Sequence, residues 1–416
     1  NVAIGYLALS AETLGDRNVA IGNNALSTQN NTSDADSYNV AVGYDAGAAV
    51  TLGIHNTLIG GLAGDALTTG FNNVAIGKGA LSKATTSDFN TAVGYLALED
   101  YNDSDSNGHN TAVGSKSQLN ATTGEFNTSL GSLSMGIGIT TGDNNVAVGY
   151  SAGLDLISGA SNVLVGNYAG ANITTGIANT SVGHLSLSTN QDGDNNTALG
   201  FKALEDFEAD TDGHGNNTAI GANAMANVST GTSNTALGAH AMSAGVTTGN
   251  SNIAIGYESG RIMEAGQQNT LIGDYTGDAL VDGSGNVAIG YRALTSEGDY
   301  GKNVAVGFQS LVSLNAGVDG NNTAVGYSAG VAMTTGVRNT LVGSLAGDGL
   351  TTGQHNVAVG YGALSATDAG DFSVAVGSGA LSVQNGDGAN SAPGVDFKNT
   401  AVGYHAGLSV TTAIQN

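Results

Sequence analysis

The 416-residue chain contains no cysteine and no tryptophan, and it has a single proline. Without cysteine, disulfide cross-links and metal sites built from thiolates are excluded. Lysine and arginine together number 10 against 34 aspartates and glutamates, which gives a net charge of −24. Such a chain repels nucleic acid and anionic membranes, and no basic cluster reverses the charge locally. No apolar run of about 18 residues occurs, so no segment is predicted to insert into a membrane.

Glycine is abundant instead, with 66 residues, and one pentapeptide returns 23 times: Asn, a β-branched residue, a small residue, an aliphatic residue and Gly. Counting this Asn as position 1, the only departure there is Ser373, and most repeats are 17 residues long. Because disordered Gly-rich linkers have no reason to keep such a period, residues 1–416 are predicted to form a single continuous repeat array. The chain opens on position 1 and Asn416 would begin another repeat, so we expect a segment of a longer protein.

The repeat predicts short β-strands. Val, Ile and Thr at positions 2 and 4 favour extended backbone, and a Gly at about every sixth residue disfavours helix. Since alternate residues of a strand face opposite sides, positions 2 and 4 share one face and the small residues at positions 3 and 5 share the other. Both faces are restricted in residue type, which predicts burial on both sides. A second short strand is predicted at positions 6 to 9.

The predicted fold is therefore all-β, a parallel β-solenoid (β-roll) of about 23 repeats of 17 residues. At a strand spacing of roughly 4.8 Å the stack would be about 110 Å long with one repeat per coil, and half that with two. The Asn at position 1 is interpreted as a ladder of side-chain amides rather than as a ligand contact. The Gly at position 5 indicates positive φ or a close backbone approach, and no phosphate-binding G-x-x-x-x-G-K-[ST] loop occurs.

A longer period, of several repeats, is superimposed on the 17-residue repeat. Leu replaces Ala at position 3 in four repeats only, at Leu58, Leu164, Leu271 and Leu341. Position 9 varies with it, running in pairs of Gly, then Leu, then more variable residues. We interpret this pattern as neighbouring repeats compensating one another's volume, in an array that grew by duplicating blocks of four or six repeats.

The core N-[VT]-A-[IV]-G-Y, with Ala three residues after the Gly, resembles the head repeats of trimeric autotransporter adhesins. It is also similar to the N-T-A-[VL]-G-Y-x-A-L repeats of phage tail fibres and related bacterial adhesins. The resemblance covers essentially the whole chain. It implies a left-handed β-roll packed as a homotrimer, in an extracellular fibre on a cell surface or a virion. The implied partner is a cell-surface glycan or protein receptor. The repeat is longer than is usual for adhesin heads, and residues 1–416 do not include the anchor barrel or chaperone domain of that family.

The longer repeats carry acidic insertions. Asp103, Asp105 and Asn107, followed by Gly, match the D-x-D-x-[DN]-G start of a calcium-binding loop, and Asp210 and Asp212 nearly repeat it. Alternating carboxylates suit Ca²⁺, but the bidentate Glu that closes an EF-hand loop is missing. The alternative is an exposed loop with solvated charge. Calcium is the one cofactor that the sequence suggests, and the repeat itself requires none.

Glycoside cleavage and ice binding are two alternatives to a fibre function. Glycoside cleavage needs two carboxylates and usually aromatic platforms, whereas Glu99 and Asp100 recur six repeats later as Glu205 and Asp206. We interpret them as duplicated surface residues and predict no catalytic residue. The recurring T-T-G suggests ice binding as another function. A flat ice-binding face needs threonines in every coil, however, and T-T-G is missing from several repeats. The prediction is a structural or adhesive fibre segment, acting as a rigid shaft or head. The alternative is a monomeric calcium-, ice- or carbohydrate-binding solenoid.

Overall fold

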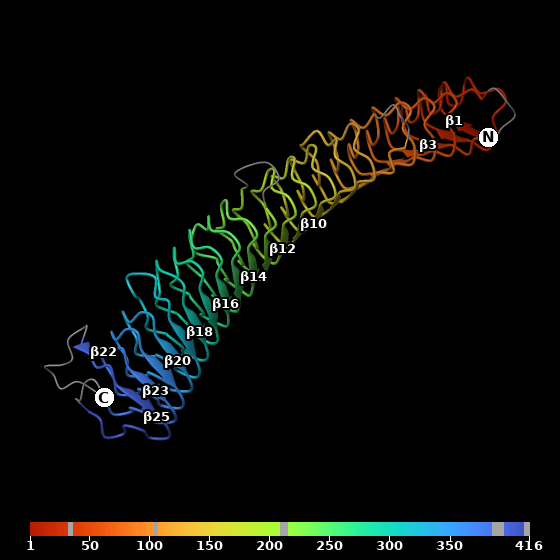
Figure 1. The fold of residues 1–416 in the computed structure, drawn as a ribbon. Helices are drawn as coiled ribbons and strands as arrows, with labels where there is room; N and C mark the ends of the chain where they lie inside the picture. The colour runs from red at the N-terminus through yellow and green to blue at the C-terminus, as the bar shows by residue number, and fades with distance from the viewer. Residues whose placement is uncertain (32–35, 103–106, 209–214, 385–394, 412–416) are drawn as a thin grey trace. The chain divides into compact units, whose positions relative to one another are not determined.

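The computed structural model describes residues 1–31, 36–102, 107–208, 215–384 and 395–411, and it contains no helix among them. The chain divides into two compact units, residues 1–215 and 216–416. Within each unit, short parallel strands stack side by side along one face of the coils (Figure 1). The predicted all-β parallel solenoid is confirmed. The part of the chain that is described holds no helix able to span a membrane.

The strands of the N-terminal unit are β1 (Val2–Ile4), β2 (Val19–Ile21), β3 (Val40–Val42), β4 (Thr57–Ile59), β5 (Val74–Ile76), β6 (Thr91–Val93), β7 (Thr111–Val113), β8 (Thr128–Leu130), β9 (Val146–Val148), β10 (Val163–Val165), β11 (Thr180–Val182) and β12 (Thr197–Leu199). Those of the C-terminal unit are β13 (Thr218–Ile220), β14 (Thr235–Leu237), β15 (Ile253–Ile255), β16 (Thr270–Ile272), β17 (Val287–Ile289), β18 (Val304–Val306), β19 (Thr323–Val325), β20 (Thr340–Val342), β21 (Val357–Val359), β23 (Val374–Val376) and β25 (Thr400–Val402). A separate parallel pair joins β22 (Gly370–Asp371) to β24 (Val395–Asp396).

Strand register shows that one repeat forms one coil. Val2 pairs with Val19, the same position of the next repeat, which excludes two repeats per coil. The register also survives the insertions, because Thr91 pairs with Thr111 across a repeat that is three residues longer. Added residues are therefore accommodated outside the strand ladder, and like positions remain stacked on like.

The predicted second strand at positions 6 to 9 is wrong, because these residues form a turn. Positions 7 and 9 adopt left-handed backbone, as at Leu96 (φ 53°) and Leu98 (φ 52°). The Leu96 N–H donates to the carbonyl of Lys78 in the preceding coil, at 3.0 Å, and the Leu98 N–H donates to Ser117 in the following coil, at 2.9 Å. Alternating signs of φ curl the chain round a corner while its backbone groups still bond to both neighbouring coils. Leu is not a residue from which left-handed backbone is expected.

The glycine at position 5 has the role expected of it. Gly60 has φ +133°, and a Cβ placed there would lie 2.5 Å from the carbonyl oxygen of Gly77, the same position in the next coil. Both the backbone conformation and the contact exclude a larger residue. Neighbouring coils therefore approach one another at position 5 so closely that no side chain fits between their backbones.

The predicted asparagine ladder is confirmed and proves to close each coil. Asn56 is fully buried, and its Oδ1 accepts a hydrogen bond from the backbone N–H of Asn73 in the next coil, at 3.0 Å. Its Nδ2 donates to the carbonyl of Gly70, near the end of its own coil, at 2.8 Å. One side chain therefore ties the two ends of a coil together and also binds the following coil. Buried polar groups left unpaired here would each cost about 1–3 kcal/mol.

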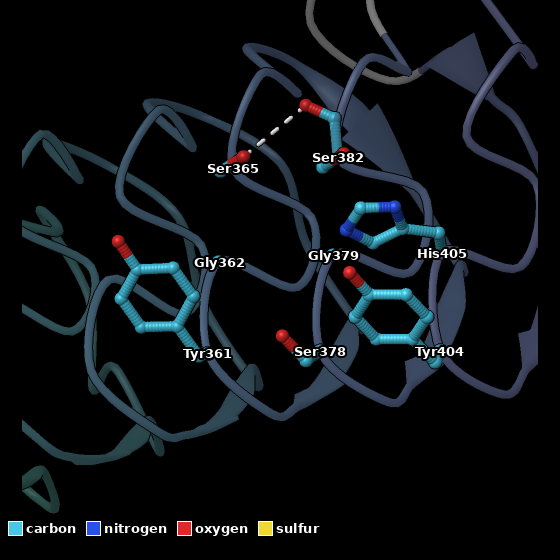
Figure 2. Close-up of a pocket in the computed structure, with 8 residues that line it drawn as sticks. All are labelled: Tyr361, Gly362, Ser365, Ser378, Gly379, Ser382, Tyr404 and His405. Carbon is cyan, nitrogen blue, oxygen red and sulfur yellow. Dashed lines mark hydrogen bonds between the residues drawn. The ribbon is translucent and has the colours of Figure 1, made fainter.

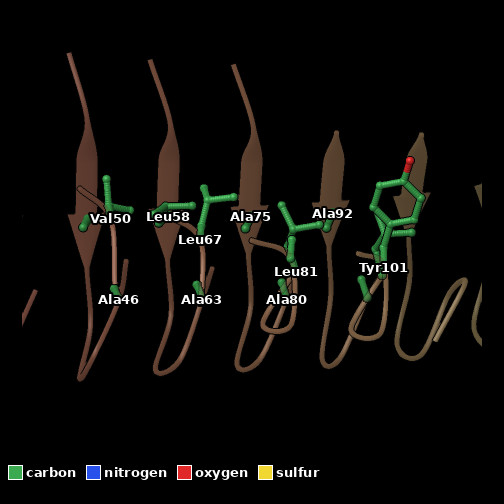
Figure 3. Close-up of a cluster of buried hydrophobic side chains, with 14 of the residues drawn as sticks. Ala46, Val50, Leu58, Ala63, Leu67, Ala75, Ala80, Leu81, Ala92 and Tyr101 are labelled. Carbon is green, nitrogen blue, oxygen red and sulfur yellow. The ribbon is translucent and has the colours of Figure 1, made fainter. Parts of the chain in front are cut away.

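Leu at position 3 fills the space that Gly at position 9 leaves open. A Cβ added to Gly47 would lie 2.6 Å from Leu58 Cδ1, and one added to Gly64 would lie 2.9 Å from Leu58 Cδ2. Figure 3 shows Leu58 among buried side chains, including Val50 of the preceding coil and Leu67 of its own coil. The same arrangement, one Leu against the Gly of its own and the preceding coil, recurs at Leu164, Leu271 and Leu341. The predicted volume compensation between repeats is confirmed.

Burial on both faces of the strand is not observed. Position 3 points into the coil and is buried, as at Ala75, whereas the aliphatic residue at position 4 points outward, and Ile76 is 37% exposed. The prediction treated restriction to aliphatic residues as a sign of burial within one chain. The coil interior is narrow, so that the Ala or Leu at position 3 and the side chains of positions 8, 9 and 12 already fill it.

Candidate functional site

An aliphatic face runs along the outside of the strands in each unit. It consists of positions 2 and 4 of successive coils, where no charged residue occurs in any of the 23 repeats. The in-register pairing stacks these side chains in two rows. Its most exposed position-4 members are Ile4, Ile59, Ile76, Leu130, Leu199, Leu237, Ile289, Val325, Val342 and Val402. A long row of exposed aliphatic side chains is unusual on a surface that meets only water.

A row of aromatic side chains borders this face in the C-terminal unit. Tyr257, Tyr291, Phe308 and Tyr327 occupy position 6 of their coils, and Tyr275 joins the row from position 7. Ring centroids of neighbours lie 5.2–6.1 Å apart along the row. Aromatic contacts of this kind contribute about 0.5–1.5 kcal/mol each beyond their buried area. The row widens the apolar surface beside the strands.

A second aromatic row lies at the last residue of the repeat, directly before the next ladder asparagine. The ring of His109 stacks between Phe89 and Phe126, with centroid distances of 4.7 and 5.1 Å. In the C-terminal unit His355 stacks on Phe372 at 4.8 Å. Both histidines have left-handed backbone. The sequence did not reveal this stacking, because the row appears only when the last residues of neighbouring repeats are compared.

The candidate calcium ligands remain a prediction. Asp103, Asp105, Asp210 and Asp212 lie outside the described residues. Asn107 is described, and it is exposed, with its backbone paired to Asp88 in an isolated parallel bridge. In the described part of the chain, no three His, Cys, Asp or Glu side chains are grouped so that they could hold a metal ion.

Three of the four carboxylates considered for catalysis lie in ion pairs with lysine. Asp100 pairs with Lys83, whose Nζ is also 3.9 Å from Glu99 Oε1. Six coils later, Glu205 Oε2 lies 3.1 Å from Lys202 Nζ. These contacts agree with the interpretation of duplicated surface residues, each pair contributing little to stability in water.

The first threonine of most T-T-G segments bonds one coil to the next. Thr68 Oγ1 donates to the carbonyl of Thr85 at 2.8 Å, and Thr351 donates to the carbonyl of Asp368 at 3.1 Å. The glycine of the same segment supplies the carbonyl that the ladder asparagine binds, as Gly70 does. The first threonine and the glycine of T-T-G are therefore part of the coil frame, and the hydroxyl protons of Thr68 and Thr351 are engaged within it.

One buried carboxyl was not anticipated. Glu297 stands at position 12, where the neighbouring coils have Leu280 and Leu314, and none of its side chain is exposed. Burial raises the pKa of Glu297 from 4.5 to about 7. The backbone amides of Ala316 and Tyr300 lower this pKa only in part, and within the described residues the carboxyl forms no hydrogen bond of ordinary geometry. A Glu at a position that is aliphatic in adjacent repeats was the signal that could have found it.

No protein-family model matches the chain, and no curated protein matches its sequence. What the chain binds therefore has to be inferred from the chemistry of its exposed surfaces.

Proposed function

We propose that this chain is a non-enzymatic segment of an extracellular fibre, on a cell surface or a virion. It serves as a rigid shaft or head that spaces or presents a surface-binding tip, with a glycan or protein receptor as partner. Three copies pack together as a homotrimer. The observation that carries the proposal is the exposed aliphatic face formed by positions 2 and 4.

The extent of this face favours self-association. Twelve strands of the N-terminal unit, spaced by roughly 4.8 Å, make a face roughly 50 Å long. A continuous apolar surface of this length reaches the several hundred Å² that usually mark an interaction surface. Sheets that stay solvated normally carry charged side chains on their outer face, and positions 2 and 4 carry none. Because every coil repeats the same face, a second copy of the chain is the partner that matches it over its whole length.

The coil frame supports a mechanical role. Each coil is bonded to the next by backbone, by asparagine and by threonine, as at β4, Asn56 and Thr68. Repeat arrays of this kind depend on contacts between neighbouring coils, so length can be added without a new core. Such a frame suits a spacer.

The mass of the chain in native buffer tests the assembly. Analytical ultracentrifugation or native mass spectrometry should give three times 40.9 kDa. Ile76→Lys places a charge in the aliphatic face and should shift the mass towards one chain. Asn72→Lys, at an exposed position where the chain elsewhere carries Lys302 and Lys398, is the matched control and should leave the mass unchanged. A single-chain mass for the wild type at all concentrations refutes the trimer.

A further inference from the structure

A groove of about 340 Å³ lies on the surface of the C-terminal unit, across the three coils that begin at Asn356, Ser373 and Asn399. Figure 2 shows the rings of Tyr361 and Tyr404 on either side of it, with Ser378 between them. These three residues occupy position 6 of consecutive coils. Tyr361 is 61% exposed, so its ring is open to a ligand, and Tyr404 belongs to the last described coil.

The groove exists because three small residues coincide. Ser378 interrupts the row of aromatic residues at position 6, and position 7 is glycine in two consecutive coils, at Gly362 and Gly379. Among the described residues, a Cβ at Gly362 would meet no atom within 4 Å, whereas one at Gly379 would lie 2.5 Å from His405 Cδ2, so the open space lies beside Gly362. Two coils of consecutive position-7 glycine occur at no other place in the 23 repeats.

A neighbouring site shows what fills such a gap elsewhere. Ser344 also interrupts the aromatic row, between Tyr327 and Tyr361, but its coil carries Leu345 at position 7. Leu345 has φ 56°, close to the φ of 58° at Gly362, so a leucine side chain is compatible with this backbone. The site at Ser344 therefore has a leucine side chain at position 7 of the same coil, whereas the site at Ser378 has only glycine there.

The walls of the groove combine aromatic faces with hydroxyl groups. Ser365 and Ser382 line it opposite the tyrosines, with Ser365 Oγ donating to the Ser382 carbonyl at 3.1 Å. The ring of His405 forms the end, stacked on Tyr404 with a centroid distance of 4.0 Å. None of the described residues that line the groove is Lys, Arg, Asp or Glu, which disfavours a charged ligand.

We propose that this groove binds a neutral pyranose ring of a glycan. Tyrosine presents an apolar ring and a hydroxyl together, which matches a sugar that has apolar C–H faces and a rim of hydroxyls. Tyr361 and Tyr404 are two coils apart, or roughly 10 Å, so a glycan chain lying along the stack would meet both rings. The volume is at the lower end of ordinary ligand sites, which fits one or two sugar rings. The chemistry depends on three coils of one chain alone, whereas its biological role as the receptor contact rests on the proposed fibre function.

Binding is tested by calorimetric titration of the full chain with two neutral probes, the β-1,4-linked tetrasaccharides of glucose and of N-acetylglucosamine. Affinity in the millimolar range, about −4 kcal/mol, is expected for at least one of them. Ser378→Tyr restores the aromatic residue and should weaken binding at least tenfold. Ser344→Tyr makes the same change at the covered gap and should leave binding unchanged. Gly362→Leu, which mimics Leu345, should weaken binding like Ser378→Tyr.

The proposal is overturned if neither tetrasaccharide binds the wild type at about 10 mM, a concentration at which a millimolar site would be mostly occupied. It is also overturned if Ser378→Tyr binds as well as the wild type, or if a heparin tetrasaccharide binds more tightly than the neutral probes. The mass of the sample is measured with each titration. A trimer that binds no sugar refutes only this inference, and a single chain that binds sugar refutes only the trimer.

Discussion

Glu297 should make the stability of the C-terminal unit fall as the pH rises through neutrality. Its pKa is raised from 4.5 to about 7 by burial, so between these values the folded chain holds a proton that the unfolded chain has lost. Stability therefore decreases as pH rises across this window, and becomes level above about pH 7. The shift corresponds to at most about 3 kcal/mol of unfolding free energy.

The substitution Glu297→Leu should abolish this dependence. Leucine matches Leu280 and Leu314 at position 12 of the adjacent coils, and it buries no polar group. The variant should be more stable than the wild type, with the gap widening by up to about 3 kcal/mol between pH 4.5 and 7. Glu264→Leu, which removes an exposed carboxylate of the same unit, is the matched control and should not change the pH profile.

The measurement has to be local, because repeat arrays need not unfold in a single step. Hydrogen exchange of peptides covering residues 269–319, corrected for the intrinsic effect of pH on exchange, gives the free energy of opening in the coils around Glu297. Parallel loss of protection in the wild type and in Glu297→Leu between pH 4.5 and 7 would show that this carboxyl is not responsible.

Leu58→Ala should destabilise the N-terminal unit by about 2–5 kcal/mol, because removing the two methyl groups that pack on Gly47 and Gly64 leaves a cavity. Adding Gly64→Leu should recover part of the loss, and a double-mutant cycle by chemical denaturation that shows no coupling would contradict the packing account. Asn127→Ala leaves the backbone N–H of Asn145 and the Gly142 carbonyl without a partner, and it should cost about 2–4 kcal/mol in the same assay. For the acidic insertion at 103–107, the calcium hypothesis predicts that EDTA lowers the melting temperature and that added Ca²⁺ restores it. An unchanged melting curve would refute calcium binding.

The frame of the solenoid could be predicted because each element depends on a residue type that recurs. Asn at position 1 and Gly at position 5 are required by contacts that every coil repeats, such as Gly60 against Gly77. The compensation of Leu58 by Gly64 was also visible, since volume is read directly from side-chain type.

The turn at positions 6 to 9 was not predictable, because its left-handed residues include leucines such as Leu96, held in place by bonds to both neighbouring coils. The outward direction of position 4 was missed for a different reason. A position restricted to aliphatic residues predicts a buried side chain, whereas the side chain of Ile76 at position 4 is 37% exposed. The groove at Ser378 was missed because it arises from the coincidence of small residues in adjacent coils, which no single repeat reveals.

The packing of Leu58 between two glycines also restricts how the array can change length. Removing the coil of residues 39–55 would bring Leu58 against Leu26, the position-9 residue of the coil before, in a space already filled. Removing residues 39–72 deletes the glycine and leucine coils together and joins two ordinary coils. Recombination between repeats can thus yield a stable product only at certain junctions. The coils with Leu at position 3 therefore determine at which repeats the array can be shortened or extended without a packing clash.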